Sequence, residues 1–204
     1  MMDPQSPHTQ RSQPRSAPSP DCKASLAVRI CRGLAFDLNR LVWNAFVNVL
    51  GGSMLVPRAV RFAIYRLAGI DVRTVNISPR CTFTHRGVHI GRGTFLNLGV
   101  TFEGEPVTIG DRTQIGPQVI FCTAYHPFNE LGIAEWGLER RGVEVGDDCY
   151  IATRVMILPG VRIASGVAVG AGSVVTHDLT EQGLYAGVPA KLIRRLGPGS
   201  AGHG

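Results

Sequence analysis

The sequence has no paired-cysteine pattern and no long apolar run. Its cysteines are odd in number and widely spaced, and none form a CxxC pair: Cys22, Cys31, Cys81, Cys122 and Cys149. This absence argues against a disulfide framework and against a cysteine zinc site, and it indicates free thiols in a reducing cytosol. No apolar run reaches the roughly 20 residues that a membrane-spanning helix requires.

No secretory signal peptide is expected either. Residues 1–22 contain no apolar stretch and are rich in Pro, Ser and Gln, so they are predicted to form a disordered tail. Residues 197–204 are predicted to be a second, flexible tail. A cytoplasmic location is therefore expected, with membrane-peripheral attachment left open.

Acidic residues are scarce. The chain has 15 Asp and Glu against 21 Lys and Arg, which gives a formal net charge of +6. Such a charge suits an anionic ligand or an acidic surface, but it is equally usual in a soluble protein without a nucleic-acid role, and no nucleic acid is expected as a partner. Glycine, in contrast, is abundant: 25 glycines in 204 residues favour many tight corners, and hence a turn-rich β fold with one main domain.

Residues 23–70 are predicted to be helical. Apolar residues recur there at steps of three and four: Leu26, Ile30, Leu34, Leu38, Leu41, Val42, Ala45, Phe46 and Val49. The polar side carries one acid, Asp37, and six arginines: Arg29, Arg32, Arg40, Arg58, Arg61 and Arg66. A basic amphipathic helix of this kind can lie on an anionic membrane. The alternative is that the apolar stripe packs on the main domain or on a neighbouring subunit while the arginines are solvated.

Residues 71–196 contain a six-residue repeat. An apolar residue returns at every sixth position at Val145, Ile151, Ile157, Ile163, Val169 and Val175. The same register holds upstream at Ile109, Ile115 and Phe121, and weaker repeats with single-residue slips start at Ile77, Phe83, Ile90 and Leu96. A unit of six residues is too short for a helical hairpin. Each unit is therefore a short strand plus a corner, and stacked coils bury a continuous core.

The pattern [Ile/Val/Leu]-[Gly/Ala]-x-x-[Val/Thr/Ser/Cys]-x resembles the hexapeptide-repeat acyltransferases. Residues 143–196 are similar throughout to the carboxyl half of the maltose, galactoside and nodulation-factor O-acetyltransferases, and with TIGDRTQIGPQVIFCTAYHP the resemblance covers roughly residues 77–196. It implies an all-β solenoid, a left-handed parallel β-helix that assembles as a homotrimer. It also implies acetyl-CoA as co-substrate and no metal. A short C-terminal helix is expected at Pro189 to Leu196.

The repeat is interrupted between Phe121 and Val145, where residues 123–144 are predicted to form a loop that leaves the coil. Members of the resembling family carry their catalytic histidine at the root of this loop, in a His-Pro pair that matches His126 and Pro127. Attack of a hydroxyl on a thioester requires removal of its proton, and imidazole has a pKa suited to that transfer near pH 7. The resemblance therefore implies that His126 is the general base.

Two further positions match the acceptor side of that family. Asn97 resembles an asparagine that lies across the subunit interface from the histidine and hydrogen-bonds the substrate; its alternative role is a corner residue with an unusual backbone angle. Glu103 and Glu105 follow where family members often carry an acid that contacts the acceptor, although the spacing is one residue shorter than in the galactoside enzymes. Tyr125, Phe128 and Trp136 are candidates for stacking on a sugar or for anchoring the loop.

The donor side of the resemblance implies that pantetheine lies along the coil corners between subunits. The matching cofactor-binding positions are Thr153, Ala171, Thr176, Lys191 and Arg194. Lys191 and Arg194 are expected one turn apart on the terminal helix, facing the CoA phosphates; the alternative is a basic helix end favoured by the helix dipole. His177 stands where the family often has lysine, and an amide at or beside Thr153 is a candidate for stabilising the oxyanion.

The expected activity is therefore transfer of an acetyl group from acetyl-CoA to a hydroxyl of a sugar, glycoside or glycan, by direct attack. An acyl-cysteine route through Cys122 is less favoured, because Cys122 occupies a small packing position of the repeat. The alternatives are a serine acetyltransferase-like enzyme, a γ-class carbonic anhydrase with three zinc-binding histidines, and a catalytically silent trimeric scaffold. His85 and His89, expected to face solvent, do not complete such a zinc site with His126.

Overall fold

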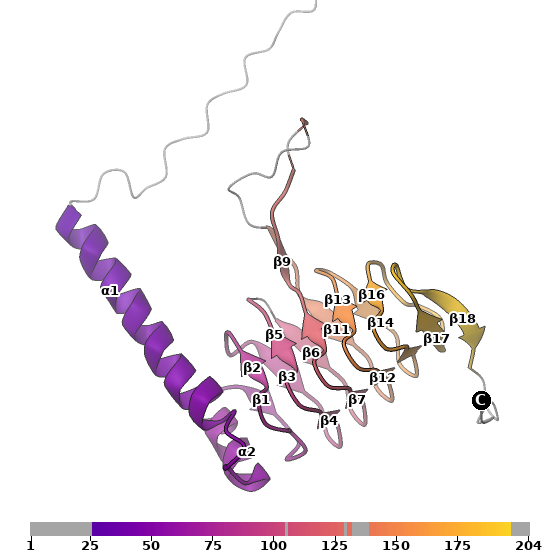
Figure 1. Ribbon diagram of the computed structural model, residues 1–204, viewed down its shortest axis with the longest axis horizontal. Helices are drawn as coiled ribbons and strands as arrows, with labels where there is room; N and C mark the ends of the chain where they lie inside the picture. The colour runs from indigo at the N-terminus through magenta and orange to yellow at the C-terminus, as the bar shows by residue number, and fades with distance from the viewer. Residues whose placement is uncertain (1–25, 105, 129, 132–138, 197–204) are drawn as a thin grey trace, which may run out of the picture. The chain divides into compact units, whose positions relative to one another are not determined.

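The computed structural model describes residues 26–104, 106–128, 130–131 and 139–196 (Figure 1). Both predicted tails, 1–22 and 197–204, lie outside the described residues. The chain divides into two compact units, residues 1–40 and residues 41–204. The described part of the first unit is helical, and the second unit contains every described strand.

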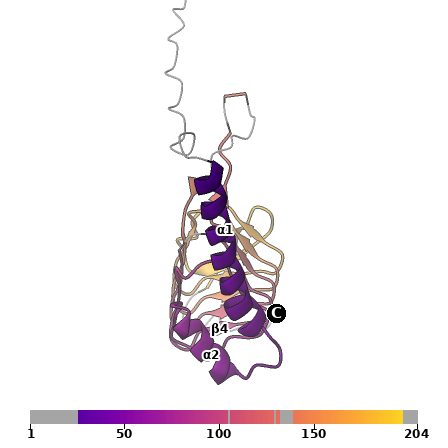
Figure 2. The same cartoon turned by 90° about the vertical axis from the view of Figure 1, so that its left-hand side faces the viewer.

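The N-terminal helical segment is confirmed. It consists of helix α1 (Leu26–Trp43), the π-helical turns η2 (Asn44–Leu50) and helix α2 (Arg58–Leu67). Helix α2 starts directly after Pro57, as expected for a residue that fixes φ and has no backbone N–H to donate. Within the second unit, α2 lies at the N-terminal end of the stack of coils (Figure 2), where it packs against β1.

Apart from one two-stranded hairpin, the strands form three sheets, here named A, B and C, which are parallel except for the last strand of sheet B. Sheet A contains β1 (Asp71–Val72), β3 (Val88–Ile90), β6 (Val107–Ile109), β11 (Val143–Val145) and β14 (Arg162–Ile163). Sheet B contains β4 (Phe95–Leu96), β7 (Gln114–Ile115), β12 (Tyr150–Ile151), β15 (Ala168–Val169), β17 (Gly183–Ala186) and β18 (Lys191–Arg195). Sheet C contains β2 (Thr82–Phe83), β5 (Thr101–Phe102), β8 (Ile120–Phe121), β13 (Met156–Ile157) and β16 (Val174–Val175).

The chain visits the three sheets in turn, so each coil has three sides and the fold is the predicted parallel β-helix. In the later coils, paired residues such as Glu144 and Arg162 are 18 positions apart. Between β3 and β6 the separation is 19, as for His89 and Thr108, and in the last coil it is 16, as for Ala168 and Leu184. The single-residue slips are thus extra residues in the corner that leads from sheet C to sheet A. We call the stacked corners between two sheets a ridge, and name the B–C ridge and the C–A ridge accordingly.

Aromatic rings form a ladder inside the β-helix. Phe83, Phe102 and Phe121 occupy paired positions in sheet C, and their ring centroids lie 4.8 Å and 5.0 Å apart in stacked pairs. Tyr65 of α2 adds a tilted ring 4.8 Å from Phe83. All four residues are fully buried. Stacked pairs of this kind add about 0.5 to 1.5 kcal/mol to the stability gained from area burial alone.

The corners are less dependent on glycine than the composition suggests. Gly93 and Gly166 have positive φ at the corner between sheets A and B, but Arg112 and Asp148 adopt φ of 54° at the equivalent points. There the two nitrogens Nε and Nη2 of Arg112 donate to the carboxylate of Asp148, both at 2.7 Å. Because both side chains are exposed, this ion pair adds little to stability and mainly orients the corner.

The first coil is closed by side chains of the helical segment. The carboxamide of Asn48 accepts a hydrogen bond from the N–H of Phe83 (2.9 Å) and donates to its carbonyl (3.1 Å). Trp43 Nε1 donates to the same carbonyl at 2.6 Å. Strand β2 is the outermost strand of sheet C, and an outer strand with unpaired backbone groups invites pairing with other chains. Asn48 pairs with the N–H and the carbonyl of Phe83, as the backbone of a further strand would.

The expectation that Arg61 lies on the solvated polar face is wrong. Its side chain is buried, with 2% exposure, and it donates to four carbonyl groups at 2.7 to 2.9 Å: those of Gly51, Ser53, Val56 and Ile77. The five N–H groups of a guanidinium can satisfy several converging carbonyls at once. Arg61 therefore joins α2 and the preceding loop to the first coil.

The predicted C-terminal helix is also wrong. Residues 191–195 form strand β18, which pairs antiparallel with β17 at the end of sheet B. Without β18, the backbone groups along the outer side of β17 would be unpaired. Their hydrogen bonds with the last residues of the chain outweigh the helical preference of the short sequence Ala190 to Leu196.

Replacing Asn48 with alanine should lower the free energy of unfolding by about 1 to 3 kcal/mol, because it leaves the N–H of Phe83 without its acceptor. Denaturant unfolding at fixed protein concentration measures the effect. Asn44→Ala is the matched control: it removes only the exposed 2.9 Å bond between the two asparagine side chains and should cost less than about 0.5 kcal/mol. Equal stability of the two variants would contradict the closing role of Asn48.

Candidate active site

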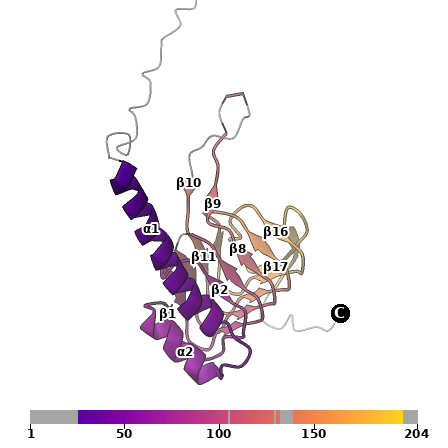
Figure 3. The same cartoon turned by 60° about the vertical axis from the view of Figure 1, so that its left-hand side comes forward.

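A hairpin stem leaves the β-helix at the C–A ridge. After β8, strand β9 (Ala124–Tyr125) pairs antiparallel with β10 (Glu139–Arg140), as Figure 3 shows. The N–H of Arg141 donates to the carbonyl of Thr123 at 2.8 Å where the two sides of the stem rejoin the coil. The predicted excursion of residues 123–144 thus has an ordered base. Residues 129 and 132–138, including Trp136, lie outside the described residues.

Side chains tie the two sides of this stem together. The hydroxyl of Tyr125 donates a hydrogen bond to the carboxylate of Glu139, and this bond raises the pKa of Tyr125. Arg141 forms an ion pair with Glu139 at 3.3 Å, and its guanidinium carbon lies 5.7 Å from the centre of the Tyr125 ring. Of the two roles considered for Tyr125, these contacts support the one that anchors the loop.

His126 follows β9 directly, so the braced stem sets the position of its backbone. Its side chain is exposed and therefore accessible to a substrate from solvent. Phe128, two residues further on, is 71% exposed, which keeps it a candidate for contact with an acceptor.

The predicted site residues separate onto two ridges of the β-helix. Glu103 follows β5 and Thr176 follows β16, and both lie on the C–A ridge from which the stem with His126 departs. Asn97 follows β4 on the B–C ridge, in an earlier coil. A single chain therefore places Glu103 and His126 on one ridge and Asn97 on another.

The B–C ridge also carries two of the predicted donor-site residues. Thr153 follows β12 and Ala171 follows β15 at equivalent points of successive coils, and the N–H of Gly172 donates to the carbonyl of Thr153 at 2.9 Å. Ala171 is exposed and Thr153 is half-buried. The two residues thus line one side of the ridge, while Thr176 lies on the other ridge.

Asn97 is half-buried, and its side-chain oxygen accepts a hydrogen bond from the N–H of Leu98 at 2.8 Å. The unusual backbone angle considered for it occurs two residues later, at Gly99, where φ is 73°. The corner therefore does not require asparagine for its backbone conformation. The local hydrogen bond occupies the carboxamide oxygen of Asn97.

Glu103 and Cys122 occupy neighbouring points of the C–A ridge. Burial, and secondarily the charge of Glu103, raises the pKa of the Cys122 thiol to about 11. A thiol with this pKa stays protonated near pH 7 and is a poor nucleophile. The geometry therefore gives no support to an acyl-cysteine intermediate. Glu105 lies outside the described residues.

The expectation that His85 and His89 face solvent is wrong, because both are half-buried and hydrogen-bonded. The His85 ring lies 2.8 Å, through Nε2, from the carbonyl oxygen of Glu103, and its Nδ1 accepts from the N–H of Gly87 at 2.9 Å. His89 Nδ1 lies 2.7 Å from the carboxylate of Asp71. Within the described part of the chain, no group of three His, Cys, Asp or Glu side chains is placed to hold a metal ion.

Lys191 and Arg194 lie on strand β18 rather than on a helix. Lys191 pairs with Ala186 and Arg194 pairs with Leu184, with a register shift between them that accommodates Ile193 as an extra residue. Side chains alternate between the faces of a strand, so three positions would normally place the two cations on opposite faces. Because Ile193 is an extra residue between them, the side chains of Lys191 and Arg194 both lie on the outer face of sheet B. The two cations thus share a face, as predicted, but on a strand with an extra residue and not on a helix.

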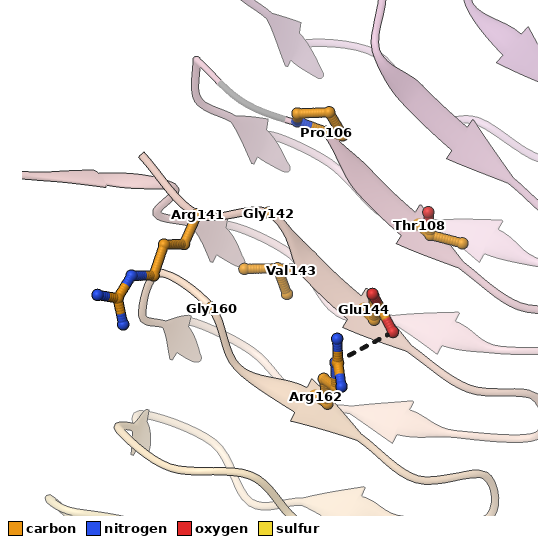
Figure 4. Close-up of a pocket in the computed structure, with 8 residues that line it drawn as sticks. All are labelled: Pro106, Thr108, Arg141, Gly142, Val143, Glu144, Gly160 and Arg162. Carbon is orange, nitrogen blue, oxygen red and sulfur yellow. Dashed lines mark ion pairs between the residues drawn. The ribbon is translucent and has the colours of Figure 1, made fainter. Parts of the chain in front are cut away.

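No pattern in the sequence indicates the hollow that lies on the outer face of sheet A, beside the base of the stem (Figure 4). It has a volume of about 340 Å³ and is lined by Pro106, Thr108, Arg141, Gly142, Val143, Glu144, Gly160 and Arg162. Glu144 and Arg162 form an ion pair at 3.4 Å across neighbouring strands. A second hollow of about 580 Å³ continues along the same face to Asp178 and Thr180. Neither hollow is lined by a predicted site residue.

Comparison with known proteins places these features in a family. Residues 142–177 match the family described as bacterial transferase hexapeptide (six repeats). An acetyltransferase-like protein of Schizosaccharomyces pombe is 39% identical over 153 residues, which are 72% of this chain and 72% of that protein. Galactoside O-acetyltransferase of Escherichia coli K12 is 32% identical over 122 residues, which are 59% of this chain and 60% of the E. coli protein.

Solved structures show the same fold. A hexapeptide-repeat acetyltransferase of Vibrio cholerae, crystallised with acetyl coenzyme A, has a TM-score of 0.66 and 28% identity, covering 85% of this chain and 91% of that one. A galactoside acetyltransferase in complex with coenzyme A has a TM-score of 0.68 and 26% identity, covering 86% and 92%. The repeat, the three-sided coil and these similarities lead to one conclusion. The chain belongs to the hexapeptide-repeat, left-handed β-helix family of CoA-dependent acyltransferases.

Proposed function

We propose that this protein transfers an acetyl group from acetyl-CoA to a hydroxyl of a sugar, glycoside or glycan. The observation that carries the proposal is the exposed imidazole of His126, held at the root of a braced stem beside the ridge with Glu103. The galactoside O-acetyltransferases among the relatives and the Vibrio structure with acetyl coenzyme A support the donor and the acceptor class.

In the proposed reaction, His126 removes the proton of the acceptor hydroxyl as its oxygen attacks the thioester carbonyl. The carbon–oxygen bond forms, the carbon–sulfur bond then breaks, and the departing thiolate takes the proton from the imidazolium. The raised pKa of Cys122 favours this direct transfer over a covalent intermediate. The backbone N–H of Thr153 or of a neighbour is the proposed donor to the transient oxyanion.

The active site is proposed to lie between two subunits of a homotrimer. Asn97 and His126 lie on different ridges of one chain, so a second copy is needed to bring an asparagine to the histidine. A three-fold assembly repeats the same contact three times and forms three equal sites. The donor residues fit this arrangement, because Thr153 and Ala171 lie on one ridge and Thr176 on the other.

The CoA phosphates are proposed to bind at the C-terminal end of the B–C ridge. Lys191 pairs with Ala186, and Ala186 lies one coil beyond Gly170. Lys191 is therefore next to the B–C ridge near the position of Ala171. Lys191 and Arg194 share the outer face of sheet B. Together they place two cations beyond the end of the ridge along which pantetheine is proposed to lie. Both side chains are exposed, so they can meet phosphate oxygens without a change of the coil.

Replacing His126 with alanine should lower the turnover number by about a hundredfold or more, with the Michaelis constant for acetyl-CoA nearly unchanged. Release of the CoA thiol, followed with the best acceptor from a panel of sugars, glycosides and serine, measures both constants. His89→Gln is the control, because His89 is bonded to Asp71 and lies outside the proposed site. An unaltered turnover number in the His126 variant would overturn its role as base.

Mixed trimers test the position of the site between subunits. His126→Ala and Asn97→Ala chains should each be nearly inactive alone. Unfolded together in equal amounts and refolded, they should recover about a quarter of wild-type activity, because each site then takes one intact residue from each of two chains at random. Light scattering verifies the assembly. A fully active monomer, or the absence of any recovery in verified mixed trimers, would contradict the arrangement.

The double variant Lys191→Ala, Arg194→Ala should raise the Michaelis constant for acetyl-CoA. Two lost charge-assisted contacts correspond to about 1 to 3 kcal/mol, and turnover at saturation should persist because the phosphates are remote from the thioester. The defect should shrink with acetyl-pantetheine, which lacks the nucleotide. Arg195→Ala is the control, since Arg195 is paired with Glu181 at 2.8 Å. Loss of turnover instead of affinity would show that the donor groove is misplaced.

A further inference from the structure

Helix α1 has an exposed apolar side. Ile30, Leu34, Leu38 and Leu41 follow one another at steps of four, four and three residues, which places them on one side of the helix. Each is more than half exposed, from 53% for Ile30 to 65% for Leu41. Large aliphatic side chains that share one exposed side form a contiguous apolar patch, and such patches mark interaction surfaces.

The opposite side of α1 is basic. Arg32, Phe36 and Arg40 follow at steps of four residues, and the guanidinium of Arg40 lies 5.7 Å from the Phe36 ring. Asp37 is the one acidic residue in the sequence of this helix. The helix therefore combines an apolar side with a polar side whose charge is almost entirely positive.

We propose that α1 binds the surface of an anionic membrane, lying in its plane with the Leu34 and Leu38 side buried at the boundary between headgroups and acyl chains. Apolar burial and attraction of the arginines to anionic lipids act together on such a helix. A helix that packs on another protein surface needs the apolar side but has no need of one-signed charge on the other. The one-signed charge therefore favours an anionic bilayer over a second copy of the chain.

An in-plane position also agrees with the length and composition of the helix. Its 18 residues extend about 27 Å, close to the thickness of a hydrocarbon core, but its arginines would then have to enter that core. Within the described residues, no helix combines the length and apolar content that crossing a membrane requires. The membrane contact does not depend on the proposed acetyl transfer, and each can fail without the other.

Sedimentation of the full chain with lipid vesicles tests the proposal. The protein should pellet with vesicles of phosphatidylcholine mixed with phosphatidylglycerol and much less with phosphatidylcholine alone. The Leu34→Ser, Leu38→Ser variant should lower the partition into anionic vesicles by about tenfold or more. Leu67→Ser, Val75→Ser is the matched control, since it removes two exposed aliphatic side chains outside α1 and should leave the partition unchanged.

A second pair of measurements isolates the charge. Arg32→Gln, Arg40→Gln should weaken binding to the anionic vesicles by about fivefold for each arginine and leave binding to neutral vesicles unaltered. Raising the salt concentration should weaken wild-type binding in the same direction. The variants should keep the wild-type thermal midpoint and acetyl-transfer activity in solution, which separates loss of the membrane contact from loss of the fold.

Two outcomes would overturn the proposal. One is wild-type protein that stays in the supernatant with both kinds of vesicle. The other is a Leu34→Ser, Leu38→Ser variant that binds anionic vesicles normally but has a lower molar mass by light scattering. That result would assign the apolar side of α1 to contact between copies of the chain.

Discussion

The structure depends on the parallel register of successive coils. Three strands and three corners close in 18 residues, so each inward side chain lies above its equivalent in the coil below and the backbone bonds continue from coil to coil. The same register stacks the corners into ridges, and a residue on a ridge keeps its place along the whole β-helix.

Departures from the 18-residue coil occur in the corner from sheet C to sheet A, which holds the extra residues of the early coils and, after β8, the stem that carries His126. Insertion at a corner leaves the inward positions undisturbed, so a functional loop can be added without a change of the core.

A stack of coils must also be closed at both ends, and this protein closes them in two ways. At the N-terminal end, Asn48 makes the hydrogen bonds that a strand next to β2 would make. Arg61 donates hydrogen bonds to carbonyl groups of the preceding loop and of the first coil. At the C-terminal end, β18 pairs with β17 and completes sheet B. The second closure has a consequence for chemistry, because the extra residue Ile193 turns Lys191 and Arg194 to the same outer face. The element that protects the last coil is thus also the one that presents the cations proposed to bind CoA.

The arrangement of polar residues is the basis for proposing that the reaction needs more than one copy of the chain. His126 is attached to the C–A ridge and Asn97 to the B–C ridge, and each ridge has only part of the proposed donor groove. In the proposed homotrimer, packing of equal chains side by side would bring the ridge of one copy to the different ridge of the next, which is the head-to-tail contact of a closed ring. The stem braced by Tyr125, Glu139 and Arg141 gives the histidine a defined position before any partner binds.

The sequence by itself determined the β-helix, its inward positions and the place of the loop, because a six-residue period is a local signal that repeats at fixed spacing. The resemblance to the hexapeptide-repeat acyltransferases singled out His126, which stands where the period is interrupted. Only the tertiary structure decided that Arg61 is buried, that the C-terminal segment is a strand, and that His85 and His89 are bonded within the fold. It alone decided as well that Asn97 and His126 belong to different ridges. These features depend on which backbone groups remain unpaired at the ends of the stack and on contacts between residues far apart in the chain, and a local pattern of residue types contains neither.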